Sequence, residues 1–240
     1  MMRTVRWLAW SAGILFLVGT ALGLVDALNL YVARPDLSNV ANMVEGRLAS
    51  YDYRVAIWPV FFLGNLSFAV GFVALTGLGL ALASWLESGS QRGVAIATSV
   101  GVGGILGAIG QLIIIGAAKA TVDIAYCDCG FRDTEIVSQI WSQMIVEGAA
   151  FWLINGGVVL LAIGIFAVAS AFRDEISAPL GIVGWITAVG LIAGVVIPQL
   201  SIGPEELGQW LQAVVSGVLV PLWVIWLGLT LPPRGAAEAA

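Results

Sequence analysis

The sequence of 240 residues contains no histidine. The chain therefore cannot ligate haem, zinc or copper through imidazole, and it cannot use a Ser-His or Cys-His pair for nucleophilic catalysis. The patterns HExxH, C-x-x-C, GxSxG and the P-loop are also missing. We expect no enzymatic activity, no cofactor and no metal. The remaining catalytic alternative is an enzyme acting through two carboxylates within the membrane.

Charge is scarce as well. Charged residues make up 10% of the chain, against about 25% in a typical soluble domain. Lysine and arginine total 10 and the net charge is −5, so the chain lacks the basic cluster that binds nucleic acid. Hydrophobic residues account for 60% and the mean hydropathy is +0.99. The expected surroundings are membrane lipid.

Long apolar runs are what the sequence has in abundance. A run of about 20 residues spans a bilayer core of roughly 30 Å as a helix. Six runs qualify, at about residues 7–29, 56–85, 94–118, 144–171, 180–200 and 211–231. The runs are continuous, which is typical of membrane helices. The predicted fold is all-α, a polytopic integral membrane bundle of six transmembrane helices in one domain (1–231), with a disordered tail (232–240).

The orientation of the chain is predicted from its basic residues. If the N-terminus faces the cytoplasm, lysine and arginine divide five against five between the two sides. Arg3 and Arg6 precede the first run closely, and the first helix usually dominates topology. We expect both termini to face the cytoplasm. The alternative is that the first run is a signal peptide, although its apolar part is longer than such peptides have.

Polar residues within the spans suggest a site. Ionisable groups are costly in lipid and by default are functional candidates. Six residues are predicted to lie in the outer half and to converge on one polar pocket: Asp26, Asn65, Gln111, Lys119, Glu147 and Asn155. Such a pocket would bind a cation or carry a proton on a carboxyl group. The structural alternative is a set of ordinary hydrogen bonds between helices.

Glycine and proline occur at several positions within the apolar runs. Gly19 and Gly23, and Gly103 and Gly107, each form a GxxxG pattern, which lets helix backbones approach closely. The helix over 94–118 is therefore predicted to be central. Gly-rich faces could also join the chain to other membrane proteins or to a second copy. Pro198 and Pro221 are expected to kink or end their helices.

Two long outer loops are predicted between the spans. In the first, Val40, Met43 and Leu48 recur at near-helical spacing, which predicts an amphipathic helix on the membrane surface or, alternatively, a solvated loop. The second is "TVDIAYCDCGFRDTEIVSQI", which holds Cys127 and Cys129. An oxidising outer space favours a disulfide between them, although one intervening residue constrains it tightly. Free or intermolecular thiols are the alternative.

The layout resembles an uncharacterised family of bacterial six-span inner-membrane proteins, a domain of unknown function. The resemblance rests on "RTVRWLAWSAGILFLVGTALGL", on the long first outer loop, and on "IFAVASAFRDEISAPLGIVGWITAVGLIAG". It implies the bacterial plasma membrane and carries no activity or site residue. The function expected is a transporter-like or ligand-sensing bundle. The alternative is an accessory or scaffold subunit of a larger membrane complex.

Overall fold

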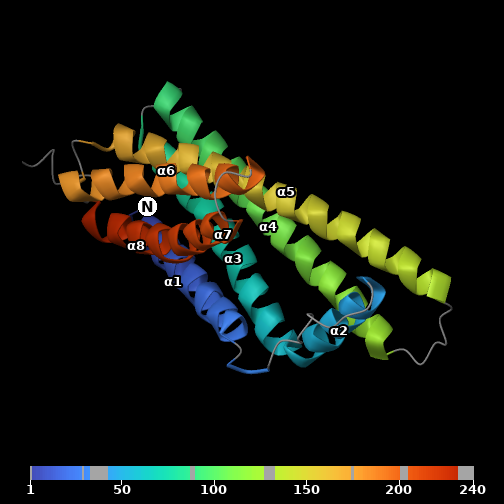
Figure 1. Ribbon diagram of the computed structural model, residues 1–240. Helices are drawn as coiled ribbons and strands as arrows, with labels where there is room; N and C mark the ends of the chain where they lie inside the picture. The colour runs from blue at the N-terminus through green and yellow to red at the C-terminus, as the bar shows by residue number, and fades with distance from the viewer. Residues whose placement is uncertain are drawn as a thin grey trace, which may run out of the picture.

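The computed structural model describes residues 2–28, 30–32, 43–86, 90–126, 133–173, 176–200 and 205–231, and these contain helices and no strand. Six helical stretches are long and apolar enough to cross a membrane. The chain is thus a multi-pass membrane protein, and the predicted all-α bundle of six spans is confirmed. The elements, shown in Figure 1, are α1 (Met2–Ala27), α2 (Met43–Ala56), α3 (Trp58–Ala83), α4 (Gln91–Tyr126), α5 (Asp133–Ala171), α6 (Ala178–Gln199), α7 (Glu205–Val214), the π-helical segment η1 (Val215–Leu219) and α8 (Val220–Thr230).

The end of α4 and the start of α5 differ from the prediction. The sequence suggested a loop from about residue 119 to 143, but α4 continues to Tyr126 and α5 already begins at Asp133. No glycine or proline lies between Lys119 and Tyr126, so nothing in the chain stops the helix there. Buried apolar positions also continue beyond the predicted spans, at Val122 in α4 and Ile140 in α5. The tail over 232–240 lies outside the described residues.

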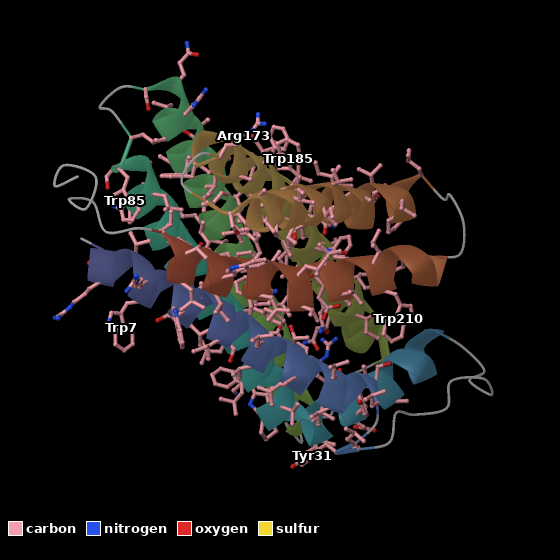
Figure 2. All side chains as sticks on the ribbon, turned by 90° about the vertical axis from the view of Figure 1, so that its left-hand side faces the viewer. Trp7, Tyr31, Trp85, Arg173, Trp185 and Trp210 are labelled. Carbon is pink, nitrogen blue, oxygen red and sulfur yellow. The ribbon has the colours of Figure 1, made fainter. Side chains whose placement is uncertain are left out.

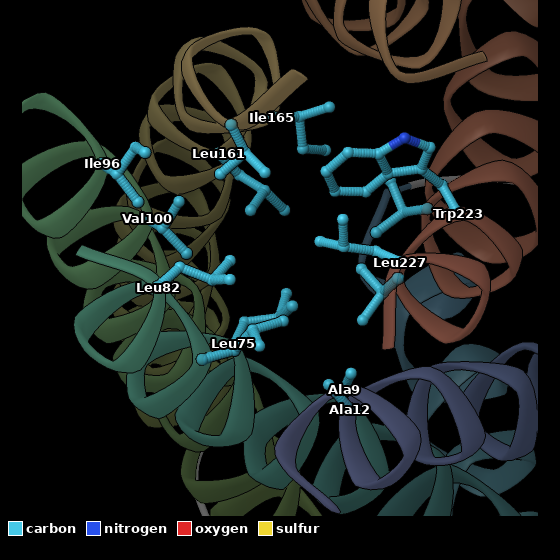
Figure 3. Close-up of a cluster of buried hydrophobic side chains, with 14 of the residues drawn as sticks. Ala9, Ala12, Leu75, Leu82, Ile96, Val100, Leu161, Ile165, Trp223 and Leu227 are labelled. Atoms are coloured by element: carbon cyan, nitrogen blue, oxygen red, sulfur yellow. The ribbon is translucent and has the colours of Figure 1, made fainter. Parts of the chain in front are cut away.

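The spans pack as a closed ring. Helix α1 packs on α3, α3 on α4, α4 on α5 and α5 on α6, and α8 contacts both α6 and α1. One contiguous hydrophobic cluster takes side chains from all six spans. Figure 3 shows side chains from several helices pointing toward one another in this cluster, among them Ala9, Ala12, Leu75, Leu82, Ile96, Val100, Leu161, Ile165, Trp223 and Leu227.

Glycines set the spacing around α4. A Cβ added to Gly103 would lie 2.8 Å from the carbonyl oxygen of Gly157 in α5, and one added to Gly104 would lie 2.7 Å from the carbonyl oxygen of Phe72 in α3. Both contacts are with backbone, which cannot move aside like a flexible side chain. Helix α4 therefore approaches both α3 and α5 closely, and Gly103, which makes the contact with α5, belongs to the predicted GxxxG pattern.

The outer wall of the bundle is apolar. Ile145 and Val189, for example, are 70% and 66% exposed, an arrangement suited to contact with lipid rather than water. The two ends of the bundle are marked in Figure 2, where Trp7, Trp85 and Arg173 lie toward one end and Tyr31 and Trp210 toward the other. We call the first the arginine end, since Arg6, Arg92 and Arg173 line cavities there. We call the other the α2 end.

The two prolines have different effects. Pro198 lies one residue before the end of α6, as expected. Pro221 instead follows η1, and the helix continues through it to Thr230. Proline has no N–H and clashes with the carbonyl four residues earlier, here that of Gly217. A π-helical turn relieves this clash by inserting a residue. The Thr20 hydroxyl of α1 donates a hydrogen bond at 3.2 Å to the Gly217 carbonyl, which Pro221 cannot reach with an N–H.

Candidate functional site

The short helix α2 organises the polar residues at its end of the bundle. For this segment the sequence predicted either an amphipathic helix or a solvated loop. The structure shows a helix from Met43 to Ala56. Helix α2 contacts α3, α4 and α5, so it packs on the bundle. Its last turns carry the two adjacent residues Tyr53 and Arg54, both half-buried.

Asp26 is held by Tyr53. The Tyr53 hydroxyl donates a hydrogen bond to Asp26 Oδ1. Asp26 lies in the last turn of α1, where the partial negative charge of the helix C-terminus disfavours a carboxylate. A donor from another helix offsets this repulsion, and it also ties α2 to α1.

Glu147 is held by Arg54. The Arg54 Nη1 atom lies 2.5 Å from Glu147 Oε1, and the side chains are 24% and 26% exposed. Gln143, one turn earlier in α5, donates from Nε2 to the same oxygen at 3.0 Å. The guanidinium also lies 5.5 Å from the centre of the Phe61 ring of α3, within the range of a cation–π interaction. Arg54 therefore links α2 to both α3 and α5.

Deeper in the bundle lies a second group of polar residues. Asn155 of α5 is 2% exposed, and its Oδ1 accepts a hydrogen bond from Gln212 Nε2 of α7 at 3.2 Å. Gln111 of α4 is 9% exposed. The residue before Gln111, Gly110, packs against Ile154 and the Ala150 carbonyl, so Gln111 and Asn155 lie on adjacent antiparallel helices about one turn apart.

The carbonyl of Gln111 is unsatisfied. Its Oε1 atom is buried and has no hydrogen-bond partner among the described residues. A buried acceptor left without a donor costs about 1–3 kcal/mol. The buried Thr187 hydroxyl of α6 is the other such atom in the described part of the chain. Of these two residues, Gln111 was among those predicted from the sequence to form a polar site.

Two of the six predicted residues have other surroundings. The Asn65 amide donates to the Phe61 carbonyl of its own helix at 2.8 Å, and Lys119 is exposed on α4. Asp26 and Glu147 are brought to one short helix, whereas Gln111 and Asn155 form the deeper level. The three cavities described for the bundle are lined by other residues, so a shared pocket of all six stays a prediction.

Four polar residues of this region were missed from the sequence, namely Tyr53, Arg54, Gln143 and Gln212. Gln143 lies one turn before Glu147, a spacing that places both on one helical face, so this partner could have been found. Tyr53, Arg54 and Gln212 contact residues far away in the chain, and no local pattern indicates their partners. Cys127 and Cys129 lie outside the described residues, so their pairing stays a prediction.

Comparisons with known proteins identify no relative: no family model, no curated protein and no solved structure matches the chain. The resemblance in layout to a family of unknown function therefore stays a prediction. What the fold defines is the class, a multi-pass membrane protein with six spans.

Proposed function

We propose that the chain is a non-enzymatic, transporter-like or ligand-sensing bundle of the bacterial plasma membrane, with both ends of the chain cytoplasmic. The α2 end then faces outward and α2 covers the approach to the buried polar level. The observation that carries the proposal is the Gln111 carbonyl, a buried acceptor with no donor among the described residues. A ligand bearing an N–H or O–H group would supply the missing donor.

The carboxylates at the α2 end indicate which class of ligand could bind. Asp26 and Glu147 are carboxylates at the α2 end, each bound by one residue of the same helix. A cationic ligand could compete with Tyr53 and Arg54 for these carboxylates and so release α2. We propose a small primary amine, which provides both the positive charge and the N–H donor that Gln111 lacks.

The conformational part of the proposal rests on the helices around the polar level. Gln212, which binds Asn155, lies three residues before the start of η1, and π-helical turns within α-helices occur frequently at functional sites. Ligand binding at Gln111 and Asn155 would therefore act on the one irregular span of the described ring.

The test is ligand-dependent stability of the purified protein in nanodiscs. Ethanolamine and putrescine are compared with tetramethylammonium, which has the charge but no N–H. Binding at 100 times Kd should stabilise the protein by about 2.7 kcal/mol, and Gln111→Leu should abolish the shift. If no amine raises the melting temperature of the wild type by more than it raises that of Gln111→Leu, each relative to the same protein without amine, the proposal is wrong. Counterflow in proteoliposomes then separates transport from sensing.

The scaffold alternative is less favoured by the glycines. Gly103 and Gly157 pack against each other within the chain, and Gly104 packs on α3. The predicted Gly-rich face of α4 is therefore used inside the bundle. Partner proteins or a second copy would have to dock elsewhere on the apolar wall.

A further inference from the structure

A groove opens between the last turn of α5 and the first turns of α6, at the arginine end of the bundle. Its volume is about 300 Å³, and its lining includes Arg173, Ser177, Gly181, Ile182 and Trp185. Arg173 and Ser177 lie at the bundle's rim, whereas Ile182 and Trp185 lie one and two turns further into the span. The groove is thus polar at one end and apolar at the other.

The polar end of the groove carries two side chains that can donate hydrogen bonds, Arg173 and Ser177. Arg173 is exposed and forms no ion pair with any described residue; Asp174 and Glu175, which follow it in the sequence, lie outside the described part. Ser177 precedes the first turn of α6, and its side chain makes no capping hydrogen bond. A guanidinium and a hydroxyl at one mouth match the oxygens of a phosphate group.

The apolar end continues along the lipid-facing side of α6. Ile182 and Trp185 are 57% and 44% exposed, and the Trp185 ring stacks on Phe166 of α5 with ring centres 5.7 Å apart. Further exposed apolar residues, Ile186 and Val189, follow toward the middle of the span. An acyl chain could lie along this surface while its headgroup stays at Arg173.

We propose that this groove binds the headgroup of an anionic phospholipid. A soluble anion would use only the polar end, whereas an anionic lipid uses both. An arginine beside aromatic residues lines two further grooves at this end of the bundle. One, of about 360 Å³, is lined by Arg6, Trp7 and Trp10, and the other, of about 310 Å³, by Arg92 and Phe166 among others. Basic sites between spans on the cytoplasmic side are suited to anionic headgroups, so the proposal also orients the arginine end toward the cytoplasm.

The experiment is native mass spectrometry of the full-length protein, titrated with phosphatidylglycerol or phosphatidylcholine. The wild type should retain phosphatidylglycerol preferentially. Arg173→Gln should weaken this retention about tenfold or more, since it removes a charge-assisted contact. Arg3→Gln is the matched control, because Arg3 is exposed near the same end but lines none of the three described grooves. Inorganic phosphate at millimolar concentration should not displace the lipid.

The outcomes separate a built site from a diffuse charge effect. Loss of phosphatidylglycerol retention with Arg173→Gln but not with Arg3→Gln supports binding in the groove. Retention by Arg173→Lys should lie between that of these two variants, because lysine keeps the charge without the guanidinium fork. Equal losses with both glutamine variants, equal retention of the two lipids, or displacement by inorganic phosphate would each overturn the proposal. Circular dichroism of the variants establishes that they fold.

Discussion

Tyr53 and Arg54 are neighbours in α2, and they bind the carboxylates of two different spans. Tyr53 binds Asp26 at the end of α1, and Arg54 binds Glu147 in α5. Helices α3 and α4 lie between those two spans in the ring. One turn of α2 therefore fastens the α2 end of the bundle across four helices, and opening that end requires both contacts to break.

Arg54→Ala is expected to loosen α2. In the variant Glu147 stays half-buried and, among the described residues, keeps Gln143 as its donor. The expected loss is about 1 kcal/mol because both partners retain some exposure. Hydrogen exchange of the amides between Met43 and Ala56 should then accelerate about fivefold. Asp52→Asn is the control, since Asp52 is exposed on the same helix. Equal exchange in both variants would show that Arg54 does not hold α2.

Tyr53→Phe tests the hydrogen bond between Tyr53 and Asp26 separately. The variant keeps the ring and removes the hydroxyl that donates to Asp26, so the carboxylate faces the negative end of α1 with less compensation. We expect a loss of about 1 kcal/mol, with faster hydrogen exchange confined to the last turn of α1 and to α2. Tyr31→Phe, at an exposed position, should change neither. Faster exchange throughout the bundle would instead indicate a general packing defect.

Much of the fold could be predicted from the sequence because hydropathy is a local property. Each span is marked by its own run of apolar residues, whatever its neighbours are. The contacts of α2 with α1 and α5 could not be predicted, because Tyr53 and Asp26 are 27 positions apart in the chain and Arg54 and Glu147 are 93 positions apart. Asp26, Glu147, Gln111 and Asn155 were identified from the cost of polar groups in lipid. Their partners depend on how the spans pack.

Gly103→Ala is expected to destabilise the bundle. The added Cβ would lie 2.8 Å from the Gly157 carbonyl oxygen and 3.0 Å from the Leu161 nitrogen, so α4 and α5 must separate. Overpacking of this kind costs about 1–3 kcal/mol. Gly116→Ala is the matched control on the same helix, where nothing lies within 4 Å, and it should stabilise by up to about 1 kcal/mol through helix propensity. Thermal unfolding in detergent measures both, and equal effects would contradict the close approach.

Gln111→Met and Asn155→Leu should have opposite effects on the unliganded protein. Methionine removes a buried acceptor that lacks a donor, so we expect stability to rise by about 1 kcal/mol. Leucine at Asn155 leaves Gln212 Nε2 without its partner and should cost about 1–3 kcal/mol. Denaturation in detergent without added amine measures the difference. If Gln111→Met is instead destabilising, Gln111 already has a partner and the proposed ligand site loses its main support.

Thr20 and Pro221 are expected to be energetically coupled although they do not pair directly. Thr20 donates to the Gly217 carbonyl, which cannot receive an α-helical hydrogen bond from Pro221 because proline has no N–H. In Pro221→Ala an N–H becomes available to that carbonyl, so Thr20→Val should cost about 0.6 kcal/mol less in this background than in the wild type, the size of an average hydrogen bond between membrane helices.

A double-mutant cycle measures this coupling. The single Thr20 hydroxyl proton is shared between the Gly217 carbonyl and the Phe16 carbonyl of its own helix, and the Phe16 carbonyl remains available to it in both backgrounds. Thr230→Val is the control, because the hydrogen bonds of the Thr230 hydroxyl to described residues all go to carbonyls of α8, and its effect should add to that of Pro221→Ala. Additivity of Thr20→Val with Pro221→Ala would show that the hydroxyl does not compensate for the proline, and the π-helical turn would then be maintained by packing alone.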